Sequence, residues 1–135
     1  KKTSIHLEKF PEIPKKWENK KIFEKWEKLK IVRNVTNAAI EVKRTNKAIG
    51  SSLEADVEVY LDEQYLKLVK DINLSEFFIT SNAKAKSMVN SDQFFKMEGI
   101  DNIAVSVKKA EGEKCSRCWK ILGNPCKRCG SVLKN

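Results

Sequence analysis

The residue types in this 135-residue sequence best suited to metal chemistry are four cysteines near its C-terminal end. They form two C-x-x-C pairs, Cys115/Cys118 and Cys126/Cys129, with seven residues between the pairs. A C-x-x-C turn brings its two sulfurs to the same side within about 4 Å of each other, so two such turns can direct four thiolates at one tetrahedral point. Zn²⁺ prefers this geometry, with Zn–S bonds of about 2.3 Å. The spacing therefore predicts one zinc ion held by all four cysteines.

Other uses of paired cysteines fit the sequence less well. Disulfides need an oxidising compartment, and no secretory leader follows Lys1. Thioredoxin-type chemistry places one C-x-x-C at the N-terminus of a helix that follows a strand, a context that neither pair obviously occupies. A catalytic zinc keeps an open coordination position and usually includes histidine, whereas four sulfurs close the shell. We therefore expect a structural ion, whose binding supplies folding free energy on the order of 10 kcal/mol to a segment with few apolar side chains.

One tryptophan and several basic side chains surround the cysteines. Trp119 directly follows the second cysteine, and the basic residues are Arg117, Lys120, Lys127 and Arg128. An aromatic plate within a basic rim suits nucleic acid, because bases stack on aromatic rings and phosphates attract cations. These five residues are therefore candidate RNA contacts. In the competing account Trp119 is a lid packed on the zinc knuckle.

Positive charge is concentrated at the two ends of the chain. The net charge is +9. Residues 1–52 hold fourteen Lys or Arg against six Asp or Glu, residues 53–110 hold seven against ten, and residues 111–135 hold six against two. Four thiolates and one Zn²⁺ would remove two positive charges from the last segment. Long-range attraction to a polyanion is thus expected mainly from the N-terminal third.

Length and composition predict a soluble globular chain of one ordinary domain or two small ones. No apolar run approaches the ~20 residues that span a bilayer. The first residue is Lys1 rather than a natural start, so we expect a piece of a longer protein.

The N-terminal third is predicted to contain an extended lead-in and a long helix. Pro11 and Pro14 restrict the residues before them to extended conformations. From Lys16 to Ile49 no Pro or Gly interrupts the chain. We expect one amphipathic helix here, or two with a break near Lys21, ended by Gly50 as the C′ residue. Its apolar positions recur at steps of three or four: Ile22, Trp26, Leu29, Val32, Val35, Ala39, Val42 and Ile49.

The opposite side of this helix is charged. Such stripes are most often solvated faces. Seven lysines between Lys15 and Lys30 outnumber three glutamates, however, which favours contact with phosphate. Trp17 and Trp26 are expected to pack rather than to stack on bases, and His6 is expected in a loop or partly packed, with no metal. The candidate RNA contacts on the helix are Arg33, Arg44, Lys47, Lys25, Lys28 and Lys30.

The middle of the chain is predicted to be a small α+β layer. Residues 56–61 alternate like a half-buried strand, and Asp62 is a candidate N-cap for a short helix through Asp71. Residues 76–81 and 102–109 are predicted strands, while 82–100 is predicted as a hairpin or irregular crossing. The fold class is thus α+β: a long amphipathic helix or helix pair, a small mixed α/β junction layer and a C-terminal four-cysteine zinc knuckle or ribbon.

No catalytic motif occurs in the sequence. The phosphate-binding patterns G-x-x-x-x-G-K-[ST] and G-x-G-x-x-G, the nucleophile pattern G-x-S-x-G and the metalloprotease pattern H-E-x-x-H are all absent. Glu54, Asp56 and Glu58 alternate along a strand without a nearby histidine, as on a solvated strand face. The residues therefore favour a binding module over an enzyme.

Two stretches resemble one known family, the bacterial isoleucyl-tRNA synthetases. The first is the zinc segment, A-E-G-E-K-C-S-R-C-W at residues 110–119 followed by C-K-R-C at 126–129. The second is R-T-N-K-A-I-G-S-S-L-E-A at residues 44–55, similar to that family's R-x-x-K-x-[IV]-G-x-S-L-E-A. F-I-T-S at 78–81 and I-A-V-S-V at 103–107 fall between them in the expected order. The resemblance covers essentially the whole chain.

The resemblance implies a C-terminal piece of a cytoplasmic ligase that attaches isoleucine to tRNA(Ile) using ATP. It implies that residues 1–52 are a lead-in and the end of a helical anticodon-binding domain, 53–110 a junction domain and 111–135 the zinc segment. ATP and isoleucine would bind only to domains upstream, because the family's adenylation signatures do not occur here. The piece is expected to be a non-catalytic monomer that binds the anticodon stem-loop and one Zn²⁺ ion. The seven residues between the cysteine pairs are fewer than the family leads us to expect, although they are enough to turn the chain back.

Two alternatives from other classes remain. A formamidopyrimidine-type DNA glycosylase ends in a similar four-cysteine finger, but begins with a catalytic Pro-Glu pair, whereas Pro11-Glu12 is internal here. A free-standing zinc RNA-binding module would have its own start methionine.

Overall fold

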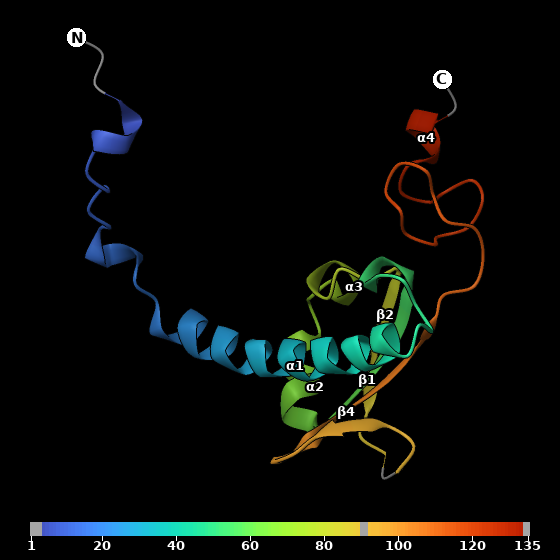
Figure 1. The fold of residues 1–135 in the computed structure, drawn as a ribbon. Helices are drawn as coiled ribbons and strands as arrows, with labels where there is room; N and C mark the ends of the chain where they lie inside the picture. Colours follow the sequence, from blue (N-terminus) through green and yellow to red (C-terminus); the bar gives the residue numbers. More distant parts are fainter. Residues whose placement is uncertain (1–3, 90–91, 134–135) are drawn as a thin grey trace.

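A computed structural model describes residues 4–89 and 92–133 and has the expected α+β class (Figure 1). A four-stranded sheet with strand order β2-β1-β4-β3 forms its centre. The strands are β1 (Ala55–Leu61), β2 (Asn82–Ser87), β3 (Phe95–Met97) and β4 (Ile100–Lys109). β1 pairs parallel with β2 and antiparallel with β4, and β3 pairs antiparallel with β4.

No helix in the described part of the chain is long and apolar enough to cross a membrane.

One face of the sheet carries the hydrophobic core. Val57 lies opposite Val107 and Val59 opposite Val105 in the β1–β4 ladder, and all four side chains are buried. Alternate strand residues point to opposite faces, so Asp56, Glu58 and Tyr60 lie on the other face. This pattern confirms the predicted strands at residues 56–61 and 102–109.

Helix α1 (Lys20–Thr45) covers the core face, packing on β4 and β3, with helix α2 (Glu63–Val69) beside it. It begins where the Asn19 side chain accepts a hydrogen bond from the Ile22 N–H at 3.2 Å, as an N-cap should. Only its second half faces the sheet: its buried residues are Leu29, Val32, Val35, Thr36, Ala39 and Ile40. The first turns project beyond the sheet (Figure 1).

The end of α1 differs from the prediction. Lys47, not Gly50, is the C′ residue, with φ of 57°. The Ala48 N–H donates to the Lys43 carbonyl and the Lys47 N–H to the Arg44 carbonyl, both at 3.0 Å. This is a Schellman motif, formed here without glycine. The predicted end came too late because Ile49 fits the apolar periodicity of the helix. Ile49 is indeed buried, but it lies beyond the end of α1.

The strand predicted at residues 76–81 is wrong. Helix α3 (Leu74–Phe77) and a turn occupy this stretch, and the strand β2 follows at residue 82. The Asn73 side chain caps α3 by accepting from the Glu76 N–H at 3.3 Å, an N-cap signal that aromatic residues 77 and 78 obscured. The predicted N-cap at Asp62 is confirmed, because its carboxylate accepts from the Tyr65 N–H at 2.9 Å and starts α2 (Glu63–Val69).

Where a hairpin or irregular crossing was predicted for residues 82–100, the described residues form the strands β2 and β3 and the start of β4. β2 lies parallel to β1, and α2 and α3 supply the crossover that parallel neighbours require. A tight hairpin does join β3 to β4, with Met97 opposite Ile100. Phe94, just before β3, stacks on Tyr60 with ring centroids 4.2 Å apart, on the sheet face away from α1.

The lead-in contains two short 3-10 helices, Ile5–Leu7 and Lys15–Trp17, joined by extended chain around the prolines. It extends away from the sheet (Figure 1). His6 is exposed within the first 3-10 helix, rather than in a loop or partly packed as expected. The prediction that Trp17 packs is wrong, because its side chain is exposed.

Candidate metal centre

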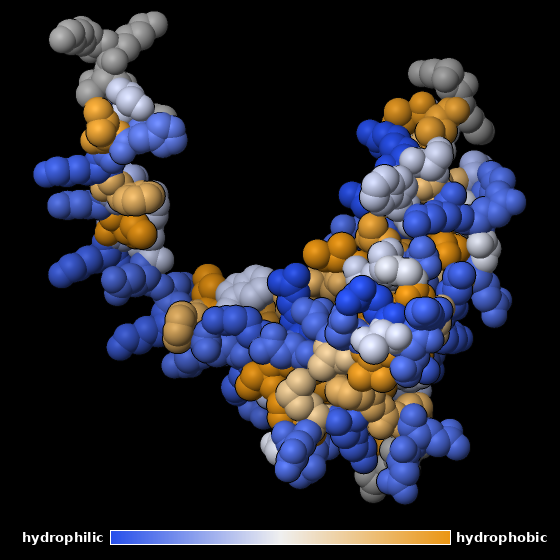
Figure 2. All heavy atoms as spheres, in the orientation of Figure 1, coloured by the Kyte–Doolittle hydropathy of each residue, from blue (hydrophilic) through white to orange (hydrophobic). Residues whose placement is uncertain are grey.

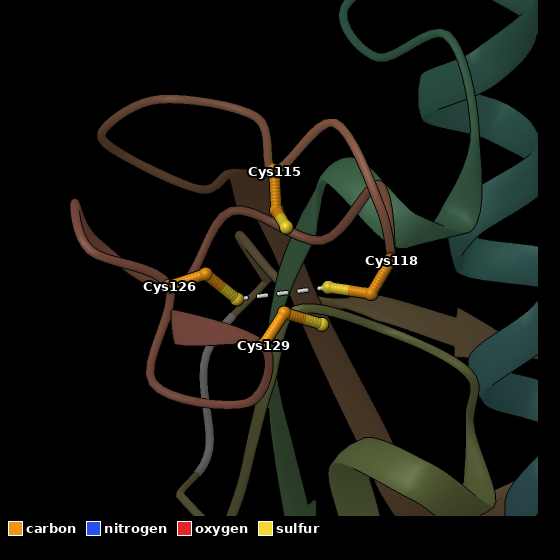
Figure 3. A group of neighbouring side chains, drawn as sticks. All are labelled: Cys115, Cys118, Cys126 and Cys129. Carbon is orange, nitrogen blue, oxygen red and sulfur yellow. Dashed lines mark hydrogen bonds between the residues drawn. The ribbon is translucent and has the colours of Figure 1, made fainter. Parts of the chain in front are cut away.

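The four cysteines converge as their spacing predicts. Their side chains point toward one common centre (Figure 3), and all four sulfurs lie within 4.8 Å of one another. Cys118 Sγ and Cys126 Sγ are 3.7 Å apart. Cys115, Cys126 and Cys129 are buried, and Cys118 is half-buried. The two C-x-x-C pairs therefore form one cluster.

The geometry of this cluster fits a tetrahedral metal ion. With metal–sulfur bonds of about 2.3 Å, the sulfurs of a tetrahedral site lie about 3.8 Å apart, close to the Cys118–Cys126 separation. Thiolate ligands select soft or borderline ions. Among the described residues, no other group of three or more His, Cys, Asp or Glu side chains is arranged to hold a metal. The four cysteines could thus hold one metal ion with four sulfur ligands.

Each cysteine pair is held by a main-chain turn. In the first turn the Trp119 N–H donates to the Cys115 carbonyl at 2.9 Å, and the Cys115 N–H donates to the Lys120 carbonyl at 3.0 Å. In the second turn the Gly130 N–H donates to the Cys126 carbonyl at 2.7 Å. Trp119 has φ of 63°, a conformation that bulky residues rarely adopt. Trp119 therefore occupies a turn position that glycine would fill with less strain.

Local hydrogen bonds and burial set the thiol acidities differently. Main-chain N–H groups of Cys118 and Arg117 donate to the Cys115 sulfur and lower its pKa to about 6. Burial raises the pKa of the Cys118 thiol to about 11. A bound cation would deprotonate the thiols that coordinate it.

Lys120 does not belong to the basic rim where the sequence placed it. Its side chain is 3% exposed, and its ammonium donates to Glu76 Oε1 at 2.7 Å and to the Ser75 carbonyl at 3.4 Å. The Lys120 ammonium lowers the pKa of the Glu76 carboxyl, and Arg128 adds a smaller effect from 3.8 Å. Lys120 joins the cysteine-bearing C-terminal segment (residues 111–133, below called the metal segment) to α3. The Lys120 ammonium is therefore not available to a polyanion.

A second set of contacts fixes the same segment on the sheet. The Ser81 hydroxyl accepts from the Ile121 N–H at 2.6 Å and donates to the Leu53 carbonyl at 2.5 Å. The Ile121 side chain is buried. Lys114 pairs with Glu54 at 3.1 Å, and the main-chain N–H of Gly50 is the largest cause of the lowered Glu54 pKa. The cysteine cluster is therefore docked on the junction layer.

The remaining rim candidates lie at the surface. The Trp119 side chain is 60% exposed, with Lys114 Nζ 5.9 Å from its ring centroid. Arg117, Lys127 and Arg128 are exposed, although Arg117 also donates to Cys129 Sγ at 3.6 Å. An exposed indole is not the closed lid of the competing account.

The basic candidates on α1 are in different environments. Lys25 and Lys28 line a shallow groove with Lys21, Glu24 and Leu68. Three candidates already have partners: Lys30 pairs with Glu27, Arg44 makes two hydrogen bonds to Glu41, and Arg33 lies with Cζ 5.7 Å from the Phe77 ring centroid. Lys47 is the exposed C′ residue of α1.

Sequence reasoning missed Glu76, Ser81, Glu54 and Lys114, which hold the metal segment in place. They lie between 40 and 60 residues from their partners in the chain. The only sequence signal for these contacts is the apolar pair Ile121-Leu122 directly after Lys120, which indicates that this part of the segment packs against another element.

Comparisons with known proteins identify the relatives of this chain. No family model matches the chain. Curated isoleucine–tRNA ligases do match: that of Pelagibacter ubique is 38% identical over 125 residues, or 93% of this chain and 13% of that protein. The ligase of Agrobacterium fabrum is 40% identical over 119 residues, 87% of this chain and 12% of the ligase, and that of Mesorhizobium japonicum is 38% identical over 90% of this chain. The chain thus spans only about an eighth of the relatives it matches. Over nearly its whole length, this chain is a homologue of one segment of the isoleucine–tRNA ligase family.

Proposed function

We propose that this chain is the C-terminal, tRNA-binding segment of an isoleucine–tRNA ligase, folded around one structural Zn²⁺ ion. The observation that carries the proposal is the exposed Trp119 beside a closed four-cysteine site, in a chain whose relatives are named isoleucine–tRNA ligases. A rigid metal knuckle can hold an aromatic side chain in solvent, where an unpaired base can stack on it.

Zinc is the ion that best fits the four sulfurs. A tetrahedral four-thiolate shell is typical of structural zinc and leaves no position for substrate or water. When bound, the ion would supply folding free energy to a segment that has little apolar core of its own. We assign Cys115, Cys118, Cys126 and Cys129 as its ligands.

The proposed RNA surface has two parts. At the metal knuckle, Trp119 would stack on an anticodon base while Arg117, Lys127 and Arg128 contact base edges or phosphates. On α1, Lys25 and Lys28 would contact phosphates of the stem-loop. Lys120 is excluded from this surface because it is buried against Glu76. Arg44 is a secondary candidate, because both its hydrogen bonds to Glu41 would have to break. Arg33 is left out of the proposed RNA surface, because its guanidinium lies over the Phe77 ring.

The chemistry of the whole ligase would take place outside this segment. We infer that upstream domains bind ATP and isoleucine and esterify tRNA(Ile) in the cytoplasm, and that this segment is a non-catalytic monomer in isolation.

The DNA glycosylase alternative is disfavoured, because the curated relatives described above are ligases and their matches cover nearly the whole of this chain.

A binding titration tests the proposal. The zinc-loaded chain is titrated with tRNA(Ile) and with a tRNA of unrelated anticodon, and a Cys118→Ser chain is the metal-site control. We expect binding that favours tRNA(Ile) and weakens in Cys118→Ser. Equal, purely salt-dependent binding of both RNAs by both chains would contradict an anticodon-reading role.

A further inference from the structure

The first turns of α1 carry a large apolar surface that the described chain leaves uncovered. Ile22 is 54%, Phe23 65% and Trp26 47% exposed. These turns project beyond the sheet, and Figure 2 shows apolar atoms along the projecting part of the molecule. Phe10, Ile13 and Trp17 of the lead-in are also exposed. Exposed apolar residues are common singly, but a contiguous group indicates an interaction surface.

The projecting turns of α1 have two distinct sides. Ile22 and Trp26 are four residues apart and Phe23 and Trp26 three, so these side chains share one side of the helix. Lys21, Lys25 and Lys28 have the spacing of a second side and line the groove next to Leu68 of α2. A surface for single-stranded RNA interleaves aromatic and basic side chains. On α1 the aromatic and the basic side chains lie on separate sides of the helix, so the apolar side is better suited to binding another protein segment than to binding RNA.

The apolar side continues onto α3 and ends at an unsatisfied donor. The Trp26 and Phe77 ring centroids are 6.0 Å apart, and the Arg33 guanidinium lies over the same Phe77 ring. Arg33 Nε is buried and has no hydrogen-bond partner among the described residues. A buried donor without a partner costs about 1–3 kcal/mol, and such groups are rarely left unpaired. The Arg33 residue as a whole is half-buried, so an outside segment would meet the rest of its side chain rather than the enclosed Nε.

We propose that Ile22, Phe23 and Trp26, with Phe77 and Arg33, form a docking surface for an amphipathic helix from the part of the ligase outside this chain. That helix would place apolar side chains on the three α1 residues and an acidic side chain beside the half-buried Arg33 side chain. The size of the relatives supports this occupant, because seven-eighths of their length lies outside the matched segment. The proposal rests on the proposed function, since it takes the chain as part of a ligase. The docked helix would leave Lys21, Lys25 and Lys28 free on the other side.

Thermal unfolding of two proteins tests this surface: the 135-residue chain and the complete ligase that carries it. The test variant is Ile22→Ser with Phe23→Ser, two exposed residues for which the described structure shows no specific contact. The matched control is Val42→Ser, an exposed apolar residue on the same helix but far from the surface. We expect the double variant to lower the midpoint of the transition in which the complete ligase unfolds this segment by more than about 1 °C, and to leave that of the isolated chain within about 1 °C. Val42→Ser should change the two proteins equally.

Other outcomes overturn the proposal in recognisable ways. An unchanged midpoint in the complete ligase means that the surface faces solvent. Loss of a dimer of the isolated chain in sedimentation means that a second copy is the occupant. A drop in tRNA affinity with unchanged midpoints means that the surface binds RNA. If the double variant destabilises the ligase while the chain fails to bind tRNA, the docking surface stands and the RNA-binding proposal fails.

Discussion

Lys120 Nζ lies 2.7 Å from Glu76 Oε1, and this ion pair joins the metal segment to the junction layer across 44 residues of sequence. The two partners are in unequal environments, because the Lys120 side chain is 3% and the Glu76 side chain 52% exposed. The neighbouring Trp119 points into solvent from the same turn. The pair therefore fixes the residue next to the exposed indole against α3.

This asymmetry predicts unequal effects of removing each partner. Glu76→Ala leaves a buried ammonium with only the Ser75 carbonyl, which should cost about 1–3 kcal/mol of unfolding free energy. Lys120→Met removes the buried charge and leaves a solvated carboxylate, so we expect a decrease below about 1 kcal/mol. Denaturant unfolding of the metal-loaded variants measures both. A larger decrease for Lys120→Met would mean that the Lys120–Glu76 ion pair makes a net contribution to stability that exceeds the cost of leaving the buried ammonium without its carboxylate.

The backbone at Trp119 predicts that glycine separates the two roles of this residue. Trp119→Gly relieves the positive φ and should leave metal affinity unchanged or higher. The same change removes the indole, so tRNA binding by the complete ligase should weaken by roughly 1–3 kcal/mol, with little change in salt dependence. Metal retention and tRNA affinity are measured on the same sample. Full metal content with unchanged tRNA affinity would exclude stacking by Trp119.

The lysines on α1 predict a change in salt dependence instead. Replacing Lys25 and Lys28 with Gln should reduce the slope of log affinity against log salt by up to about 0.7–0.9 for each phosphate that the variant no longer binds. Lys67→Gln on α2, an exposed lysine paired with Glu63, is the control for removal of charge alone. An equal change of slope in the control would show that net charge, and not direct binding of phosphate, is responsible.

The local parts of this structure could be predicted from the sequence. The helix, the first and last strands and the Asp62 cap depend on periodicity and turn chemistry within a few residues. The cysteine cluster was also predictable, because each C-x-x-C turn places its two sulfurs on the same side of the chain without help from distant residues.

The errors arose where distant contacts decide the structure. F-F-I-T-S at residues 77–81 has the composition of a strand, yet its Asn73 cap and the packing of Phe77 on Trp26 make its beginning helical. Lys120 looked like a surface cation because its partner Glu76 is remote in sequence. The exposure of Ile22 at the start of a regular apolar stripe depends on where the sheet ends, which periodicity does not encode.

The sheet face away from α1 predicts a pH-dependent contribution to stability. Lys86 and the Tyr60 hydroxyl, both hydrogen-bonded to the Glu58 carboxylate, lower the Glu58 pKa below its ordinary value of about 4.3. A lowered carboxyl pKa stabilises the folded state above the unfolded pKa, and this contribution disappears as the pH falls through the folded pKa. The difference in unfolding free energy between the wild type and Glu58→Gln should therefore be present at pH 6–7, at below about 1 kcal/mol, and should vanish as the pH falls below the lowered Glu58 pKa. A difference independent of pH would exclude the ion pair as its origin.

The metal content of the purified chain tests the central claim most directly. Protein produced and purified under reducing conditions without added metal is analysed by elemental analysis together with a Cys126→Ser variant. We expect one zinc per wild-type chain, well below one in the variant, and circular dichroism of the variant that retains α1 and the central sheet. A zinc content near zero in the wild type, or an intact disulfide between the cysteine pairs, would contradict the assignment of Cys115, Cys118, Cys126 and Cys129 as zinc ligands.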